Sequence, residues 1–457
     1  MPETITRIEH ARFVITVDPQ RRMIADGSIL IEGNTIRAVG KAAELADQPV
    51  DRTIDAREMV VTPGFLNGHM HVSYAHAVRG IFPDDVKNRL AYVFQMQAAM
   101  TAEEEHDTTL LGLVELLKGG TTCFVDPGST QYLETVLPAY EAAGCRVMTG
   151  EHVTDLENAM NLPVYDTQTA VQHVRDSIER SDGLLDGRVR AWAMPFSQAV
   201  CSPSLLRECD AIAEQLGTMI TLHHFGGLRA GGAPASVDDL PTGQLRALGV
   251  LSPRLVLSHG MNLADAEISH ISASGAHVVM CPSTVLKGGG SIRDGGRLPE
   301  LLEAGVDVAL GTDSVNSSNY LDMVRAMNAA AVVYKDARRD PAQITAETAL
   351  ELATIRGARA LGIDALVGSI EIGKRADLVL FDTRRAEWRA LTNPVRNLVY
   401  SASADSVHTV LVDGRVVVEG GVATFADEWD LIQKVESHGE RIRASTGIGW
   451  DTDWPLE

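Results

Sequence analysis

The sequence is short of cysteine and of positive charge, and each shortage excludes a class of protein. Among its 457 residues there are only five cysteines and no Cys-x-x-Cys pair, so a disulfide scaffold is not expected. Lys and Arg number 40 against 61 Asp and Glu, and the net charge of -21 opposes binding to nucleic acid or to an anionic membrane surface. The partners that remain are small-molecule substrates and other subunits.

Long apolar runs are also missing. No stretch approaches the roughly 18 apolar residues that a membrane-spanning helix needs. The N-terminal residues MPETITRIEHARFVITVD are charged throughout and lack the apolar core of a signal peptide. Together with the unpaired cysteines, these features predict a cytoplasmic protein. Hydrophobic residues make up 45% of the chain, a composition that excludes disorder.

Both ends of the chain have the pattern of a small β domain. Residues 1–58 contain short alternating runs joined by turn residues, and the same pattern returns over residues 366–425, where Asp413-Gly414 is a strong hairpin signal. We expect the two segments to form one composite β-sandwich that the rest of the chain divides in sequence. The tail, residues 426–457, is predicted to be helical and polar.

Residues 59–365 alternate short apolar runs with longer stretches of helical periodicity. Eight such runs, each followed by a helix or a long loop, predict an α/β fold built on a (β/α)8 barrel of the TIM type. The eight predicted strands cover residues 60–71, 121–126, 145–150, 189–194, 219–224, 254–260, 276–282 and 306–313.

Histidines and one aspartate gather where these strands end, which is where a barrel of this type carries its catalytic groups. His69 and His71 close the first strand and point to the same side, so two imidazoles can bind one ion. The later strand ends carry His223 and His224 on the fifth strand, His259 on the sixth and Asp313 on the eighth. The joint pattern predicts a metal site.

The motifs around these residues resemble those of the amidohydrolase superfamily. The first strand carries PGFLNGHMH, the sixth LSHG, the seventh HVVMCPST and the eighth LGTDSVNSSNYLDM, and SIEIGKRADLVLFD resembles the return to the small β domain. The sequence is most similar to the branch of triazine hydrolases, chlorohydrolases and cytosine or guanine deaminases. That branch also contains phenylurea and thiocarbamate (molinate) herbicide hydrolases.

The resemblance implies one divalent metal ion per subunit, and a set of histidines with one carboxylate suits zinc first, with iron or cobalt possible. It implies that His69, His71, the fifth-strand histidine and Asp313 hold this ion, and that His259 stands beside the metal water. Relatives are commonly dimers or higher assemblies, so a homo-oligomer is expected.

The family pattern also selects between the two fifth-strand histidines, because its ligand stands six residues after a glycine. Counting from Gly217 gives His223, which then shares the inward face of the strand with Thr221. His224 remains the alternative.

Two departures from the family pattern bear on the activity. Binuclear members use a carbamylated lysine at a middle strand, and AWAMPFSQ at the end of the fourth strand has none, which favours a single metal. Glu151, after the third strand, could bridge two metals, although a helix cap or salt bridge is preferred. Deaminases of the branch carry a glutamate three residues after the fifth-strand ligand, where it passes a proton to a ring nitrogen. Gly226 stands there, or Gly227 in the other register.

We therefore expect a hydrolase of non-peptide carbon–nitrogen bonds that acts on a urea, carbamate or anilide, such as a phenylurea-like xenobiotic. A divalent metal would lower the pKa of a bound water to roughly 7, Asp313 would carry the proton, and His259 would stabilise the developing charge. Two alternatives stay open: a deaminase or dechlorinase of a triazine, pyrimidine or purine, and an inactive scaffold homologue. His76 and Arg79, which follow the first strand, are interpreted as loop anchors.

Overall fold

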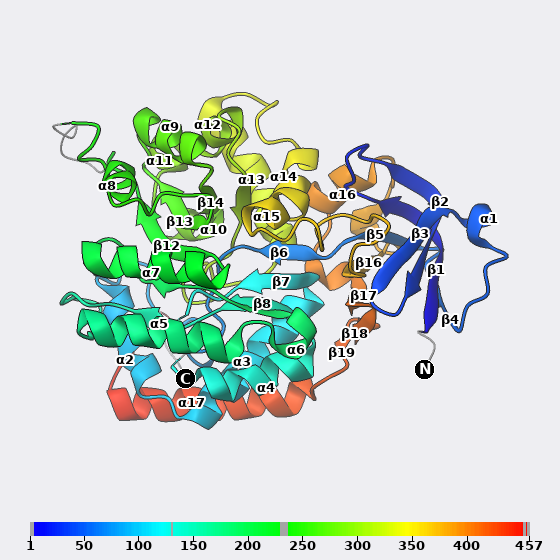
Figure 1. Ribbon diagram of the computed structural model, residues 1–457. Coiled ribbons are helices and arrows are strands. Elements are labelled where there is room, and N and C mark those ends of the chain that lie inside the picture. The colour runs from blue at the N-terminus through cyan, green and yellow to red at the C-terminus, as the bar shows by residue number, and fades with distance from the viewer. Residues whose placement is uncertain (1–3, 129–130, 229–235, 451–453, 455–457) are drawn as a thin grey trace.

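Eight parallel strands surrounded by helices form the barrel, and a sheet built from both chain ends lies beside it (Figure 1). The computed structural model describes residues 4–128, 131–228, 236–450 and 454. The barrel strands are β6 (Phe65–Asn67), β7 (Thr121–Val125), β8 (Arg146–Thr149), β10 (Val189–Ala191), β12 (Ile220–Phe225), β13 (Leu255–Met261), β14 (His277–Met280) and β15 (Val308–Leu310). The predicted (β/α)8 barrel is confirmed.

Backbone hydrogen bonds close these strands into a ring. β6, β7, β8 and β10 form one parallel group, and β12 to β15 form the other. Ala193 joins the two groups on one side, since its amide donates to Met219 and its carbonyl accepts from Thr221. On the other side the amide of Gly68 donates to the carbonyl of Leu310 over 2.8 Å. The C-terminal ends of the first and eighth strands therefore lie side by side.

The barrel strands are short apolar runs because they are buried on both faces. Their inward side chains fill the barrel, among them Leu66, Val125, Met148 and Val256, each at most 1% exposed. Because the interior is packed solid, chemistry is confined to the rim where the strands end.

Helices cover the outside of the barrel (Figure 1). Their bounds are α2 (Arg89–Ala98), α3 (Ala102–Lys118), α4 (Leu133–Ala143), α5 (Thr167–Ser181), α6 (Leu184–Gly187), α7 (Pro203–Leu216), α8 (Pro241–Ala247), α9 (Asp265–Ser274), α10 (Pro282–Lys287), α11 (Ile292–Gly295), α12 (Leu298–Glu303), α13 (Met323–Arg338), α14 (Ala346–Leu352) and α15 (Ile355–Ala360). Several helices begin at side-chain caps that the sequence supplies, such as Thr101 before α3, which accepts from the amide of Glu104. Two-residue strands β9 (His152–Val153) and β11 (Met194–Pro195) extend the third and fourth units of the barrel and pair with each other.

The second body is a nine-stranded mixed sheet that confirms the composite β domain. Its strands are β1 (Ile5–Ile15), β2 (Met23–Glu32), β3 (Thr35–Lys41), β4 (Arg52–Asp55), β5 (Met59–Pro63), β16 (Leu378–Asp382), β17 (Val407–Val412), β18 (Arg415–Glu419) and β19 (Val422–Ala423). Antiparallel pairing of β5 with β16 joins the N-terminal strands to the C-terminal ones. Short helices α1 (Ala42–Leu45) and α16 (Pro394–Tyr400) accompany them.

The first predicted strand, residues 60–71, is not a single strand. Its first part belongs to β5 in the small sheet, and only Phe65–Asn67 forms the barrel strand β6. Gly64 lies at the junction, where a Cβ atom would come within 2.1 Å of the Thr122 side chain. The chain therefore passes from the sheet into the barrel through a gap that only glycine fits.

The C-terminal tail contains one long helix, α17 (Glu428–Thr446), which lies along α3 (Figure 1). Charged side chains join the two helices: Lys118 contacts Glu428 over 2.7 Å, His438 contacts Asp107, and Arg441 contacts Glu104. Among the described residues, no helix has both the length and the apolar character that crossing a membrane requires.

Candidate metal centre

His69 and His71 stand just beyond the end of β6, and hydrogen bonds hold the eighth strand end against them. The Asn67 side chain donates to the Thr312 hydroxyl over 2.8 Å and accepts from the Thr312 amide over 3.1 Å. The amide of Asp313 then donates to the carbonyl of His69 over 2.9 Å. These bonds fix the Asp313 carboxylate beside both imidazoles.

Five side chains from four strand ends converge at this point. The Asp313 Oδ1 atom lies 3.9 Å from His69 Nε2 and 3.8 Å from His71 Nε2. Possible ligand atoms of His69, His71 and His223 lie within 4.8 Å of one another, and so do those of His69, His259 and Asp313. The structure thus brings together all five residues that the sequence analysis selected.

The two fifth-strand histidines face different surroundings. The His223 Nδ1 atom donates to the Phe196 carbonyl over 3.0 Å, because a carbonyl can only accept, and this leaves Nε2 as the basic nitrogen. The His224 ring belongs to neither group of converging ligand atoms, and its Nδ1 contacts the Gln198 side chain over 3.2 Å. The geometry therefore brings His223, rather than the alternative His224, into the cluster.

The histidines of the cluster are neutral, which is the form that binds a metal. Burial lowers the pKa of His69 and His71 well below the usual value, and repulsion between neighbouring imidazoles adds to the effect. Burial also lowers the pKa of His223 and of His259 to about 4. Asp313 is different, because burial raises its pKa while the amide of Ser314 and the His223 ring act against that rise.

His69 provides the clearest test of whether these residues suit a metal ion. Both of its ring nitrogens are buried and have no hydrogen-bond partner among the described residues. An unpaired buried polar atom costs about 1 to 3 kcal/mol, and a neutral ring always has one nitrogen that can coordinate an ion. A divalent cation would satisfy that nitrogen, and the set of histidines with one carboxylate suits zinc.

His259 and Asp313 adopt backbone conformations that such residues rarely take. Their φ angles are 78° and 59°, in the left-handed region. Strain of this kind is found at functional sites, where the surrounding structure imposes it. The Phe225 ring stacks against His259 with 5.4 Å between the ring centroids and fixes the face of the imidazole.

A sixth side chain, His152 on β9, lies in the same site and was not selected from the sequence. Its ring centroid is 5.6 Å from that of His223 and 6.2 Å from that of His71. Its neighbour Glu151 instead faces His173 and Arg180, at 2.9 and 3.1 Å, as the preferred salt-bridge interpretation predicts. The signal that could have identified His152 is its place just after the third strand.

The position of the missing glutamate has no room for any side chain. A Cβ atom on Gly226 would lie 2.4 Å from the carbonyl oxygen of Asn262 and 2.6 Å from the Cα of Leu263. The Gly226 amide donates to the Met261 carbonyl, so the backbone is held in this place. A glycine at this position therefore allows the close contact between the chain after β12 and the chain after β13.

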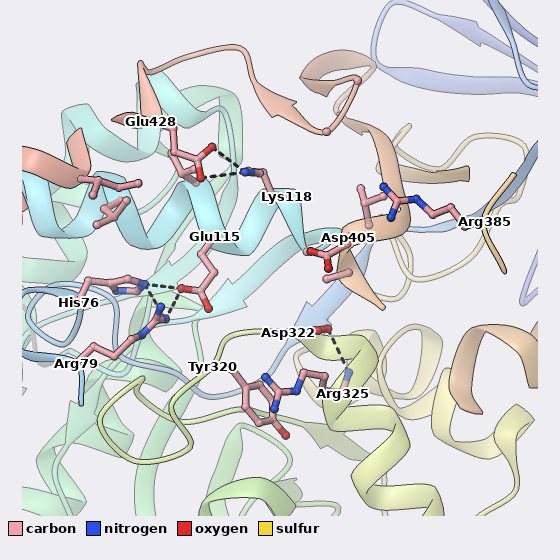
Figure 2. A pocket seen from close by; sticks show the side chains of 18 residues that line it. His76, Arg79, Glu115, Lys118, Tyr320, Asp322, Arg325, Arg385, Asp405 and Glu428 are labelled. Carbon is pink, nitrogen blue, oxygen red and sulfur yellow. Dashed lines mark hydrogen bonds and ion pairs between the residues drawn. The ribbon is translucent and has the colours of Figure 1, made fainter. Parts of the chain in front are cut away.

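His76 and Arg79 lie outside the cluster, next to a separate cavity of about 690 Å³ between α3, the start of α13 and the C-terminal strands (Figure 2). Both contact Glu115 on α3. Glu115 also accepts from the amide of Leu321, in the loop that follows Asp313. The predicted anchoring role of the two residues agrees with these contacts.

Comparison with known proteins gives a consistent result. Residues 60–417 match the model of the amidohydrolase family. The chain is 32% identical to a 5-methylthioadenosine/S-adenosylhomocysteine deaminase of Syntrophobacter fumaroxidans, over 94% of this chain and 95% of the relative. It is 33% identical to a 5'-deoxyadenosine deaminase of Methanothermobacter thermautotrophicus, over 91% and 94%.

Two solved structures share the fold and hold zinc. An adenosine deaminase from Xanthomonas campestris with bound zinc superposes with a TM-score of 0.86 at 26% identity, covering 97% of this chain and all of that one. The atrazine chlorohydrolase of Arthrobacter aurescens, complexed with zinc, gives 0.84 at 25% identity, with 95% and 100% covered.

These relatives correct part of the expected placement within the superfamily. The names match the deaminase and triazine hydrolase part of the predicted branch, and they give no support for a place beside phenylurea or thiocarbamate hydrolases. The inactive scaffold is not retained, because family and relatives indicate a hydrolase of carbon–nitrogen bonds other than peptide bonds. With a metal-binding arrangement at the rim of its barrel, this chain belongs to the amidohydrolase family.

Proposed function

We propose that this protein is a metal-dependent aminohydrolase that removes an amino group from an aromatic N-heterocycle, with adenosine-type nucleosides as the first candidates. This was the alternative to the urea or carbamate hydrolase expected from the sequence. The observation that carries it is the similarity along nearly the whole chain to enzymes named as deaminases of adenosine compounds.

The surroundings of the cluster support a flat aromatic substrate. Phe196 stacks on His223 with centroids 4.5 Å apart, and Phe225 stacks on His259. The ring centroids of Tyr74 and His71 are 6.0 Å apart. Of the Phe225 residue surface, 43% is exposed to solvent. Among these three rings Phe225 offers an exposed surface, and such a ring binds a heterocycle by stacking as well as by burial of apolar surface. Phe196 and Tyr74 are buried and pack against the imidazoles.

The ion would be held by His69, His71, His223 and Asp313, with zinc as the first candidate. A single ion per subunit is proposed because no lysine follows the fourth strand to hold a second one. When bound, the ion supplies a water molecule whose pKa is low enough for attack at neutral pH.

The protein side chains then handle the proton and the developing charge. The Asp313 carboxylate takes the proton of the attacking water and passes it to the leaving nitrogen, acting first as a base and then as an acid. The His259 ring, held against Phe225, hydrogen-bonds the oxygen that adds to the substrate carbon and stabilises its charge. Ammonia leaves, the second proton of the water ends on the ring nitrogen, and the heterocycle keeps a carbonyl oxygen.

Hydrolysis of a urea, carbamate or anilide is the second candidate, and Gly226 favours it. The backbone contacts of Gly226 leave no side chain at the position that serves deaminases of the branch as the proton carrier to a ring nitrogen. An acyclic substrate has no ring nitrogen to protonate, so Asp313 and His259 would suffice.

Product analysis separates the two candidates. The zinc-loaded protein is incubated with 5'-deoxyadenosine, 5-methylthioadenosine and aminotriazines in one panel, and with phenylureas and phenylcarbamates in the other. Release of ammonia from the first panel supports the proposal. If only the second panel is consumed, with release of aniline and carbon dioxide, deamination is wrong and the second candidate replaces it.

A further inference from the structure

His152 is a polar residue of the site for which the reaction outlined above has no use. It lies on β9, which pairs with β11, and its backbone amide donates to the carbonyl of Gly128 over 2.9 Å. Its ring packs on Phe196 with 5.0 Å between centroids. The imidazole therefore occupies a fixed place against Phe196, beside the cluster.

The hydrogen bonding of His152 is incomplete. Its Nδ1 atom is buried and has no partner among the described residues. Three other buried histidines, all outside the metal cluster, have one nitrogen bonded within the chain: His76 to Glu115, His224 to Gln198 and His270 to the Thr242 hydroxyl. The second nitrogen of His76 and that of His224 are unpaired as well. Buried polar side chains are rarely left without a partner, so an unpaired one in a binding site indicates a partner that comes from outside.

His152 is not placed among the proposed metal ligands. His152 belongs to neither of the two groups of converging ligand atoms. Its ring packs on Phe196 and its centroid is 5.6 Å from that of His223, so a heterocycle held at the cluster would lie next to it. A nitrogen in the edge of a heterocycle can donate to an imidazole or accept from it.

We propose that His152 is a substrate-contacting residue whose imidazole hydrogen-bonds a ring nitrogen of the heterocycle. The polar contact to the substrate ring then comes from the third strand of the barrel. Gly226, after the fifth strand, has no side chain to make it. The proposal rests on the proposed function, since it concerns the substrate of the same site. It names His152 as a determinant of specificity for N-heterocycles over substrates without a ring nitrogen.

Three variants of the full-length, zinc-loaded protein test this. His152→Phe keeps a ring of similar shape without nitrogen, and His152→Gln restores a polar group. His277→Phe is the matched control, because His277 also has a buried Nδ1 without a hydrogen-bond partner but lies at the start of β14, at the opposite end of the barrel. Zinc content is measured for each, together with calorimetric binding of hypoxanthine, a deaminated purine that is not turned over.

We expect His152→Phe to retain zinc and to bind hypoxanthine at least about tenfold more weakly, with a matching rise in KM for a turned-over nucleoside. His152→Gln should recover part of the affinity, and His277→Phe should bind as the wild type does. Equal affinity of the wild type and His152→Phe, or no binding by the wild type, would overturn the proposal. Loss of zinc in His152→Phe would also overturn it, since His152 would then support the metal site.

The two proposals fail in different ways. If ammonia is released from a nucleoside with the same KM by wild type and His152→Phe, deamination stands and the contact is wrong. If hypoxanthine binding depends on His152 while no member of the heterocycle panel loses ammonia, the contact stands and deamination is wrong.

Discussion

Asp313 has the most demanding task of any single residue in the site, because it is both a proposed ligand and the proposed proton carrier. Asp313→Asn keeps the shape and one coordinating oxygen but cannot take a proton. We expect turnover to fall by about 10²- to 10⁴-fold, while zinc content is reduced rather than abolished. Steady-state kinetics and metal analysis of the same preparation check this. Activity close to wild type would contradict the assignment of the base.

Gly226 is a second residue at which a substitution has a clear expected effect. In Gly226→Ala the new methyl group would collide with backbone atoms of Asn262 and Leu263, which cannot move aside as a flexible side chain can. We expect a loss of about 1 to 3 kcal/mol, seen as a lower thermal midpoint, together with lower activity because the ends of β12 and β13 shift. Gly449→Ala is the control, since a Cβ there meets nothing within 4 Å. Equal midpoints for the two variants would disprove the steric argument.

The contacts of Glu115 predict that the stability of the protein depends on pH. Burial raises its pKa, but hydrogen bonding to His76 and the charge of Arg79 outweigh burial and lower the pKa to about 2. Because the unfolded chain binds this proton near pH 4.5, the stabilisation is present above that pH and is lost as the pH falls toward 2. In urea unfolding, Glu115→Gln should be about 1 to 2 kcal/mol less stable than wild type at pH 7. The difference should shrink below pH 4.5, and a constant difference at all pH values would contradict the assignment.

At this scale the sequence predicted which side chains come together, because the candidate ligands stand where strands end and side-chain alternation orients them. His69, His71 and Asp313 needed only that rule. His152 was missed because its neighbour Glu151 is the more conspicuous residue, and which of two adjacent residues turns inward depends on the irregular path of the chain after β8. Periodicity carries no information about such a path.

The elements are joined by a buried ion pair between the barrel and the small sheet. Arg146 on β8 contacts Asp377 over 3.2 Å and Asp413, in the turn between β17 and β18, over 2.6 Å. The Arg146 and Asp377 side chains are only 4% and 2% exposed. Buried pairs of this kind contribute little when intact but are costly to break, because the partner is left charged and unpaired.

Arg146→Met should therefore destabilise the protein by about 3 to 5 kcal/mol. Adding Asp377→Asn removes one of the two carboxylates left without a partner and should recover part of that loss. The thermal midpoints of the single and the double variant measure the recovery. If the double variant is no more stable than the single one, packing of the arginine stem rather than its charge holds the junction.

The bounds of some strands were predicted more accurately than those of others. The later barrel strands were found close to their observed bounds because they are separate apolar runs. The first was merged with β5, although Pro63-Gly64 in the middle of the run is a turn signal, because nothing local shows that pairing changes there from one sheet to the other.

For the whole molecule, the count of eight βα units and the matching patterns at the two chain ends were enough to predict the architecture. The substrate was not predictable in the same way, because it depends on how loops from several strands meet. The expected urea or carbamate substrate came from the absence of one side chain at Gly226, whereas similarity over the whole chain favours a deaminase. The homo-oligomer remains a prediction that light scattering can check.

The central claim is that one metal ion in the histidine and aspartate cluster is required for hydrolysis of a carbon–nitrogen bond in an N-heterocycle. The most direct test is ammonia release from 5'-deoxyadenosine and related aminated heterocycles as zinc is added back to chelated protein. The account predicts that activity rises in proportion to zinc and reaches its maximum at one ion per subunit. Failure of every heterocycle to release ammonia at full zinc occupancy, or equal release by the chelated protein, would contradict it.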